Sequence, residues 1–484
     1  MSSRQQVFNP YLPSWEYVPD GEPHKFGDRI YVYGSHDKFG GSTFCMNDYV
    51  CWSAPETDLS DWRYEGVIYR KTQDPDNRSG RKSMYAPDVC QGPDGKYYLY
   101  YALDFVGKIG VAVCDKPAGK YEFIGFVHYP DGTILGRREG DPFQFDPGLY
   151  TEDGNIYLYT GFCPKGFPFS LTIGKRISRE GAMVMTLEQD MLTIKKPMKF
   201  IAKSIYNSQG TPYEGHEFFE APSMRKIGDK YYFIYSSYIG HELCYAISDR
   251  PDGDFTFGGT LVSIGDIGLR GIMGVKDAAN YTGNTHGSIV GACGKYYVFY
   301  HRQTNRHCFS RQACAEEITI RPDGHIEQAE VTSCGLNGGS LAGKGEYEAR
   351  IACNLTSSAG GRFYGVFRGF EGAHPYFTQS GRDREGTPDQ YIANIRNGTE
   401  AGFKYFDMTF TTGIALTVRG KAKGQLIVSF SPCGEPVSVI PVDINSKEWT
   451  KLPAASVRGG SVKTALYIRY EGTGRLDFRS FELT

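Results

Sequence analysis

The 484-residue chain lacks an excess of charge of either sign, since 53 Lys and Arg residues stand against 55 Asp and Glu residues. A net charge of −2 provides no broad basic surface, so we expect no nucleic-acid partner. No hydrophobic run is long enough to span a membrane, and no apolar segment follows Met1. We therefore expect no membrane association and a cytoplasmic location, although a secreted protein trimmed of its leader would look the same.

The twelve cysteines lack the paired spacing of a zinc site and the pattern of a compact disulfide framework. Half of them lie in or beside apolar segments: Cys45, Cys51, Cys90, Cys114, Cys163 and Cys244. We interpret these as buried free thiols. Long helices are not indicated either, because 60 Gly and 25 Pro suit many turns, and an aromatic content of 14% supplies packing material for β structure.

A tyrosine-rich hydrophobic strand recurs five times along the chain. The five copies are residues 29–33, 96–100, 155–159, 230–235 and 295–300. When Tyr31, Tyr98, Tyr157, Tyr232 and Tyr297 are taken as equivalent, the intervals are 67, 59, 75 and 65 residues. A period of this size holds about four short strands with their turns, which is one propeller blade. The repeat predicts an all-β fold that contains a five-bladed β-propeller.

One polar residue stands 10 to 12 residues before each of these tyrosines: Asp20, Asp88, Asp146, Glu220 and His286. Residues at a constant offset from a repeated strand take the same place in each blade, so we predict that the five form one ring. Carboxylates gathered in one cleft repel each other, and this splits their pKa values as acid–base catalysis requires. Taken singly, each acidic residue could instead cap a turn.

The segments around these residues resemble glycoside hydrolase family 43, which includes β-xylosidases, α-L-arabinofuranosidases and arabinanases built on a five-bladed propeller. The similarity covers about residues 8–332. It depends on residues 19–23 (PDGEP), 85–89 (YAPDV), 145–147 (FDP), 219–223 (FEAPS) and 285–288 (THGS), and on a first-blade signature at 51–62.

This resemblance implies a set of catalytic roles. Asp20 matches the general base, Glu220 the general acid, and Asp146 the residue that tunes the pKa of the acid and orients it. Glu22 is a competitor for the role of base, because the family usually has proline directly after its base. Glu217 and Glu214 lie near Glu220, but only Glu220 stands in the Glu-Ala-Pro context.

The resemblance also implies sugar contacts for Asp88, for Arg311 and for Tyr85, which stands where the family often has tryptophan. His286 matches a histidine at the bottom of the cavity that often contacts a central calcium ion. The expected reaction is inverting hydrolysis that releases β-D-xylose or α-L-arabinofuranose from plant cell-wall oligosaccharides such as arabinoxylan, and it requires no cofactor. Endo-arabinanase activity, galactan cleavage and a non-catalytic glycan-binding propeller are the alternatives.

Near residue 333 the sequence changes to a flexible, Gly-rich run, so we expect a propeller domain at 1–333 and a second domain at 334–484. Short alternating strands at 414–419, 426–430, 465–470 and 476–481 predict a β-sandwich. The end of the chain is similar to family 6 carbohydrate-binding modules. This similarity makes Glu346, Glu348 and Asp477 candidates for a structural calcium site, although each could be a simple surface carboxylate. The domain could bind polysaccharide, shape the cavity rim or stabilise the fold, and the sequence allows a homo-oligomer.

Overall fold

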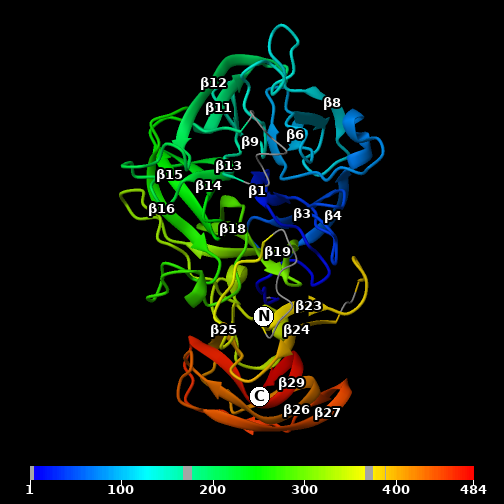
Figure 1. Ribbon diagram of the computed structural model, residues 1–484, viewed down its shortest axis with the longest axis vertical. Coiled ribbons are helices and arrows are strands. Elements are labelled where there is room, and N and C mark those ends of the chain that lie inside the picture. Colours follow the sequence, from blue (N-terminus) through cyan, green and yellow to red (C-terminus); the bar gives the residue numbers. More distant parts are fainter. Residues whose placement is uncertain (1–4, 167–176, 366–373, 387–388) are drawn as a thin grey trace.

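The computed structural model describes residues 5–166, 177–365, 374–386 and 389–484. Among these residues nearly all regular structure is β-strand, arranged as a five-bladed propeller followed by a curled-sheet domain (Figure 1). The predicted fold class is confirmed. The described helices are short 3₁₀ turns: η1 (Lys71–Gln73), η2 (Pro75–Asn77), η4 (Val275–Asp277), η5 (Gly335–Asn337) and η6 (Ala349–Ile351). None of them has the length and apolar character needed to cross a membrane.

Each blade is an antiparallel sheet whose strands follow in chain order. Blade 1 contains β1 (Glu22–Phe26), β2 (Arg29–Tyr33), β3 (Tyr49–Pro55) and β4 (Arg63–Tyr69), and blade 2 contains β5 (Asp88–Gln91), β6 (Tyr97–Ala102), β7 (Ile109–Cys114) and β8 (Glu122–Phe126). Blade 3 contains β9 (Gly148–Glu152), β10 (Asn155–Thr160), β11 (Gly181–Leu187) and β12 (Ile194–Lys203). Blade 4 contains β13 (Phe218–Ile227), β14 (Lys230–Ser237), β15 (Glu242–Ser248) and β16 (Thr256–Ser263), and blade 5 contains β17 (Ser288–Ala292), β18 (Lys295–Thr304) and β19 (His307–Ile318).

The first strands of the blades line the axis and close the ring. Strand β1 contacts β5 and β17, β9 contacts β5 and β13, and β13 contacts β17. The five tyrosine-rich segments form the second strands, β2, β6, β10, β14 and β18. Alternate residues of a strand point to opposite faces, so Ile30 and Val32 pack against blade 5 while Tyr31 and Tyr33 pack against blade 2. A hydrophobic cluster of this kind fills every interface between neighbouring blades.

The N-terminal segment completes blade 5, which has only three strands of its own. The amide of Tyr11 donates to the carbonyl of Ala313 on β19 at 3.2 Å. The Asn9 side chain donates to the carbonyl of Ala315 at 2.9 Å and accepts from its amide at 3.0 Å. These bonds cover the open edge of β19, so the first and last parts of the propeller sequence are held together.

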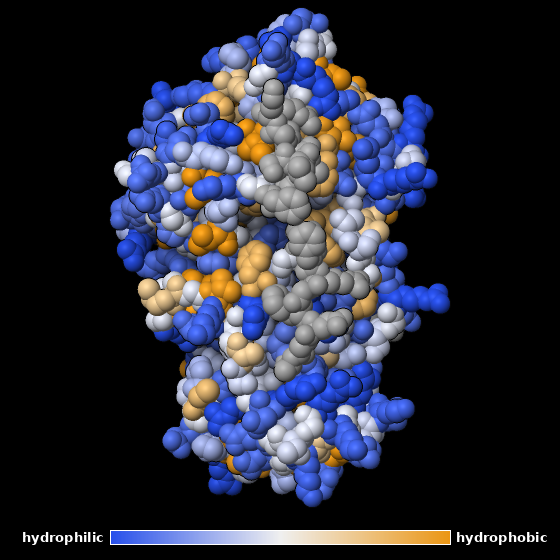
Figure 2. Space-filling view, in the orientation of Figure 1, coloured by the Kyte–Doolittle hydropathy of each residue, from blue (hydrophilic) through white to orange (hydrophobic). Residues whose placement is uncertain are grey.

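The second domain is one continuous hydrogen-bonded sheet that curls around its own core. Its strands are β20 (Leu341–Ala342), β21 (Gly345–Glu348), β22 (Asn354–Thr356), β23 (Tyr376–Gln379), β24 (Gln390–Ile395), β25 (Glu400–Asp407), β26 (Gly413–Ser429), β27 (Ser438–Lys451), β28 (Ala455–Ser456) and β29 (Thr464–Leu483). The four predicted strands merge into two, because residues 420–425 and 471–475 stay paired between β26 and β29. On the face seen in Figure 2 this domain is largely hydrophilic, whereas apolar residues gather toward the middle of the propeller.

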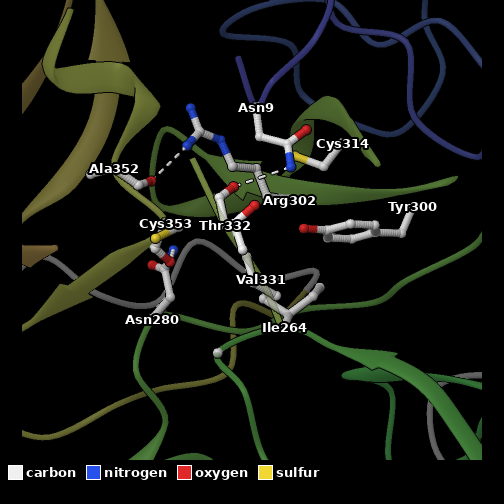
Figure 3. Close-up of a pocket in the computed structure, with 11 residues that line it drawn as sticks. Asn9, Ile264, Asn280, Tyr300, Arg302, Cys314, Val331, Thr332, Ala352 and Cys353 are labelled. Carbon is white, nitrogen blue, oxygen red and sulfur yellow. Dashed lines mark hydrogen bonds between the residues drawn. The ribbon is translucent and has the colours of Figure 1, made fainter. Parts of the chain in front are cut away.

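The domains meet in an extensive junction. The Lys404 ammonium is 1% exposed and bonds Asp266 at 2.7 Å and Glu330 at 2.9 Å, which links β25 to the propeller. A cavity of about 20 Å³, close to the room for one water molecule, lies at the junction beside Arg302 (Figure 3). No carboxylate lines this cavity. The boundary predicted after residue 333 falls between β19 and β20, next to η5.

Candidate active site

Strand register shows which residues of different blades are equivalent at the axis. In each blade, one residue of the first strand pairs with the residue two positions after the reference tyrosine. These five residues are Glu22, Asp88, Gly148, Ser223 and Ser288. We call Glu22, Asp88, Ser223 and Ser288 the second layer. Two residues before these positions in blades 1, 3 and 5 stand Asp20, Asp146 and His286. Glu220 takes the corresponding place in blade 4, and these four residues form the first layer.

Local backbone geometry presents the first-layer side chains. Asp20 and Asp146 have left-handed φ angles of 57° and 44°, an uncommon conformation that aspartate tolerates better than most residues. In blade 4 the register of β13 shifts between Glu220 and Ser223, and Ala221 has a φ of 63°. This irregularity accounts for the longer offset of Glu220 from its tyrosine, because it inserts one extra residue.

Asp20 lies in a positively charged environment. Its Oδ1 accepts from Arg311 Nη1 at 2.7 Å and lies 3.3 Å from His301 Nδ1. Burial raises the pKa of Asp20, but the positive charges of Arg311 and His286 outweigh burial and lower the pKa below its usual value. Burial and Arg311 reduce the pKa of His301 to about 3, so this ring is neutral. The ring then donates from Nε2 to the carbonyl of Asn284 at 2.8 Å and accepts from the Asp20 amide at 3.2 Å.

Glu220 and Asp146 are shifted in the opposite direction. Burial, and then the charge of Asp146, raises the pKa of Glu220 well above its usual value. Burial also raises the pKa of Asp146 to about 7, with Asp20 adding to the rise and His286 opposing it. At neutral pH the first layer therefore combines a protonated Glu220 with an ionised Asp20, which is the division of roles that acid–base catalysis needs.

His286 stands between the two layers. Its Nε2 lies 3.5 Å from Glu22 Oε1 and its Nδ1 lies 3.8 Å from Asp146 Oδ2. Burial lowers the pKa of His286, but the contact with Glu22 and the charge of Asp146 raise it to about 9 overall. The ring is therefore a cation at neutral pH and helps to hold the neighbouring carboxylates.

The prediction that Asp88 lies in one ring with Asp20, Asp146, Glu220 and His286 is wrong. Asp88 belongs to the second layer and is fully buried. Its Oδ1 contacts His24 Nε2 at 2.6 Å and accepts from the Val89 amide at 2.7 Å, and its Oδ2 accepts from the Leu149 amide at 2.6 Å. With both oxygens occupied by the protein, Asp88 does not face a sugar. The misplacement arises because residues 92–96 form a longer β5–β6 turn than the two-residue turns of the other blades.

Arg311 also takes a different place from the one expected. It is 2% exposed, and its guanidinium bonds Asp20 and Asp37 instead of facing a cavity. Arg311 therefore supports Asp20 instead of binding sugar hydroxyls. Tyr85 fits the predicted contact better, because it is partly exposed and its ring packs on Phe145, next to Asp146, at 5.0 Å. Its hydroxyl donates to Asp104 at 2.9 Å.

The competing acidic residues lie outside the first layer. Glu22 Oε2 accepts from Ser223 at 2.9 Å and from Arg225 at 2.8 Å, so it belongs to the second layer. Glu217 accepts from Ser208 and from the Gly215 amide, both at 3.0 Å. Glu214 accepts from the amide of Gly210 at 2.8 Å. Asp20 and Glu220 are therefore the better candidates for base and acid.

The axis offers few direct ligands for calcium. Among the described residues, Glu22 Oε1 is buried without a hydrogen-bond partner and lies near His24 and Asp88. Calcium takes six to eight oxygen ligands, and the cationic His286 is a poor ligand, so water would have to supply most of the coordination shell. A central calcium stays a prediction.

The second candidate calcium site is not assembled in the described residues. Glu346 accepts from Ser480 at 2.7 Å, and Glu348 pairs with the Arg350 guanidinium. Asp477 pairs with Arg419 at 3.0 Å. The three carboxylates bind three separate partners and do not converge on one point.

Sequence reasoning missed Asp37 and His301, which both contact the Asp20 environment. Asp37 lies in a loop after β2, and His301 follows Tyr300 on β18. Neither has a counterpart at the same place in the other blades, so the repeat gave no signal for them. All twelve cysteines are free thiols, and the expectation of burial is confirmed for five of the six that were named, while Cys114 is only partly buried.

Comparison with known proteins shows that most of the chain matches one protein family. The sequence matches the family model described as glycosyl hydrolases family 43 over residues 16–326. It is 52% identical to a xylosidase/arabinosidase from Thermoclostridium stercorarium over 99% of both chains. It is 30% identical to a β-xylosidase from Xylanibacter ruminicola, over 66% of this chain and 98% of that protein.

Solved structures show the same architecture. An arabinoxylan arabinofuranohydrolase of family 43 from Bacillus subtilis, in complex with cellotetraose, aligns with a TM-score of 0.51 at 20% identity and covers 98% of this chain and 97% of that chain. A family 43 β-xylosidase/α-arabinofuranosidase from a compost metagenome, with xylotriose, aligns with a TM-score of 0.52 at 26% identity over 67% of this chain and 98% of that chain.

Proposed function

The chain belongs to glycosyl hydrolase family 43 and is a glycoside hydrolase, and we propose that it cleaves pentosides with inversion through Asp20 and Glu220. The observation that carries this proposal is the different setting of two carboxyl groups within one layer: Asp20 accepts from the Arg311 guanidinium at 2.7 Å, whereas burial and the charge of Asp146 act on Glu220. The pKa of Asp20 is lowered and that of Glu220 is raised. One carboxylate is therefore ready to accept a proton and the other to donate one.

In this proposal Asp20 takes a proton from a water molecule that attacks the anomeric carbon. Glu220 gives its proton to the departing glycosidic oxygen on the other side of the sugar. Inversion needs a gap of about 6.5–9.5 Å between the two carboxyl groups, which leaves room for the water. Asp20 and Glu220 come from blades 1 and 4, which are not adjacent in the ring, and this supports inversion over a retaining mechanism.

Asp146 and His286 complete the proposed machinery. The negative charge of Asp146 keeps the proton on Glu220. His286 is a cation beside Asp146, so it reduces the repulsion between the carboxylates of the first layer. No step requires a metal, so a calcium ion at the axis would act on structure alone.

The proposed substrates are β-D-xylosides and α-L-arabinofuranosides cleaved from chain ends. The support comes from the relative that is 52% identical over the full length and is named a xylosidase/arabinosidase. In both pentoses the reacting carbon and its hydroxyl neighbours can meet the same acid and base. The partly exposed ring of Tyr85, next to Phe145, offers an apolar surface for the sugar.

The test compares wild type, Asp20→Asn and Glu220→Gln on 4-nitrophenyl β-D-xyloside, 4-nitrophenyl α-L-arabinofuranoside and xylobiose, with NMR to identify the product anomer. We expect inverted products, and a near-complete loss of xylobiose cleavage in both variants. The nitrophenyl group needs little protonation to leave, so Glu220→Gln should keep more activity on the aryl glycosides than on xylobiose. Retained configuration, or full xylobiose activity in either variant, would refute the mechanism. Inactivity of the wild type on all three would redirect the search to arabinan and galactan.

A further inference from the structure

A loop of the second domain, residues 380–386, reaches the segment of blade 1 that connects β2 to β3. Asp383 accepts hydrogen bonds with both of its oxygens. Oδ1 accepts from the Phe39 amide at 2.8 Å, and Oδ2 accepts from the Asn47 side chain at 3.1 Å. The same Asn47 nitrogen donates to the carbonyl of Asp37 at 2.9 Å. A residue more than 300 positions away in the sequence thus fixes the segment 36–47 of blade 1.

The next residue of the loop strengthens this attachment. Arg384 Nη1 lies 2.7 Å from Glu16 Oε1 and 2.7 Å from His36 Nε2, and the guanidinium stacks 5.0 Å from the Trp15 ring. Glu16 is buried and also accepts from Trp52 Nε1 at 3.0 Å. Arg384 therefore holds the segment at its first residue, His36, while Asp383 holds it at Phe39 and at its last residue, Asn47.

The fixed segment carries the residue that orients Arg311. Asp37 is fully buried, and its carboxylate accepts from Arg311 Nε at 2.9 Å and from Nη2 at 3.0 Å. This two-point contact sets the plane of the guanidinium, since a planar fork meets two oxygens in one geometry. The remaining nitrogen, Nη1, is then directed at Asp20 Oδ1 at 2.7 Å. Hydrogen bonds thus connect Asp383 to the backbone of Asp37 through Asn47, and the carboxylate of Asp37 to Asp20 through Arg311.

We propose that Asp383 is a positioning residue for glycoside cleavage, because it holds the segment through which Asp37 and Arg311 orient the proposed base Asp20. The inference rests on the proposed function, since it takes Asp20 as the base. It assigns to the second domain a role in the chemistry of the propeller. The other part of the junction provides a contrast. Lys404 and Tyr405 are also partly or fully buried, but the side-chain hydrogen bonds described for them go to Asp266, Arg270 and Glu330 and not to the segment 36–47 or to Arg311.

The experiment compares Asp383→Ala and Asp383→Asn in the full-length protein. Controls are Arg382→Ala, an exposed side chain of the same loop, and Tyr405→Phe, which removes a bond of 2.8 Å across the junction. The readouts are kcat, KM and the pH dependence of kcat/KM on whichever 4-nitrophenyl pentoside the wild type cleaves. The melting temperature is measured alongside.

For Asp383→Ala we expect a fall of about tenfold in kcat with a smaller change in KM, because the base is misplaced while the sugar still binds. The acidic limb of the profile should move up by about one pH unit, because Asp20 loses part of the contact with Arg311 that keeps it ionised. Asp383→Asn keeps one acceptor oxygen but places its NH₂ against the second donor, so it should recover only part of both effects. The two controls should keep the wild-type profile.

An unchanged acidic limb in Asp383→Ala would overturn the inference even if the melting temperature fell, since that result describes interdomain attachment alone. The same shift in Tyr405→Phe would overturn it as well. If Asp383→Ala does not fold, Arg384→Ala carries the same test, with an upward move of the acidic limb expected and an unchanged limb refuting the inference. Asp20→Asn is assayed in parallel. Full activity in that variant refutes the proposed base, whereas an inactive Asp20→Asn with a wild-type profile for Asp383→Ala refutes only the positioning role.

Discussion

The two layers of polar residues at the propeller axis differ in how their charges are compensated. Second-layer groups bind across blades: Glu22 of blade 1 binds Ser223 and Arg225 of blade 4, and Ser223 bonds Ser288 of blade 5 at 2.8 Å. Asp88 of blade 2 accepts from Leu149 of blade 3. First-layer Asp146 and Glu220 have raised pKa values instead. An offset of two residues, or three in blade 4, thus separates groups that hold the ring together from groups kept ready to exchange protons.

The largest expected effect is the loss of activity in the first layer. Glu220→Gln and Asp20→Asn should each reduce kcat/KM on xylobiose by about 10²–10⁴-fold, the usual contribution of a general acid or base. Unfolding in urea should show little loss of stability for Glu220→Gln, because the neutral amide replaces a carboxyl that is already protonated. A large loss of stability without loss of activity would reverse the comparison between the layers.

For the second layer we expect the converse, a loss of stability with little loss of activity. Asp88→Asn places an amide NH₂ against a backbone donor, so we expect a loss of about 2–4 kcal/mol in the free energy of unfolding. The value of kcat for the remaining folded enzyme should change far less than in Glu220→Gln. Glu122→Gln, an exposed change on β8 of the same blade, is the matched control. Urea unfolding and activity assays on the same samples decide the outcome, and unchanged stability would contradict the assigned role.

His286, which lies between the layers, should link stability to pH. Contacts with Glu22 and Asp146 raise its folded-state pKa from 6.5 to about 9. A raised pKa contributes stability that is complete below pH 6.5 and disappears as the pH rises through 9. Between pH 6 and 9 the wild type should therefore lose on the order of 2 kcal/mol relative to His286→Gln. Parallel unfolding curves for the two proteins at both pH values would rule this out.

The smallest expected effect is a change in the pKa of the proposed general acid, Glu220. Burial and the charge of Asp146 raise the pKa of Glu220, so Asp146→Asn should lower that pKa. The basic limb of the kcat/KM profile should then move to lower pH by about one unit. The acidic limb, which reports Asp20, should move much less. A basic limb that stays in place would show that burial alone keeps the proton on Glu220.

The fold was predictable because its signal is local and repeated. Each second strand carries the same tyrosine pattern, and each packs against both neighbouring blades, so the ring follows from the repeat. The first layer was predictable for the same reason, since Asp20, Asp146 and His286 share one offset in blades with identical turns. Asp88 was misplaced because one turn is longer, a feature that alters register without altering the strand pattern.

The support around Asp20 could not be read from the sequence. Asp37, His301 and Arg311 come from a loop and two strands of blades 1 and 5, and none belongs to the repeat. Asp383 lies in the second domain, where nothing in the sequence links it to blade 1. These contacts depend on how distant segments pack, so they appear only in three dimensions.

The bonds of Asn9 and Tyr11 to β19 also constrain how the protein can be made. These N-terminal residues emerge from the ribosome before any blade exists, yet their partners at Ala313 and Ala315 are synthesised about 300 residues later. The five-bladed ring therefore cannot close until nearly the whole propeller has been translated. Until then the apolar face of blade 1 that packs on blade 5 stays uncovered, and exposed apolar surface of this kind favours aggregation of an unfinished chain.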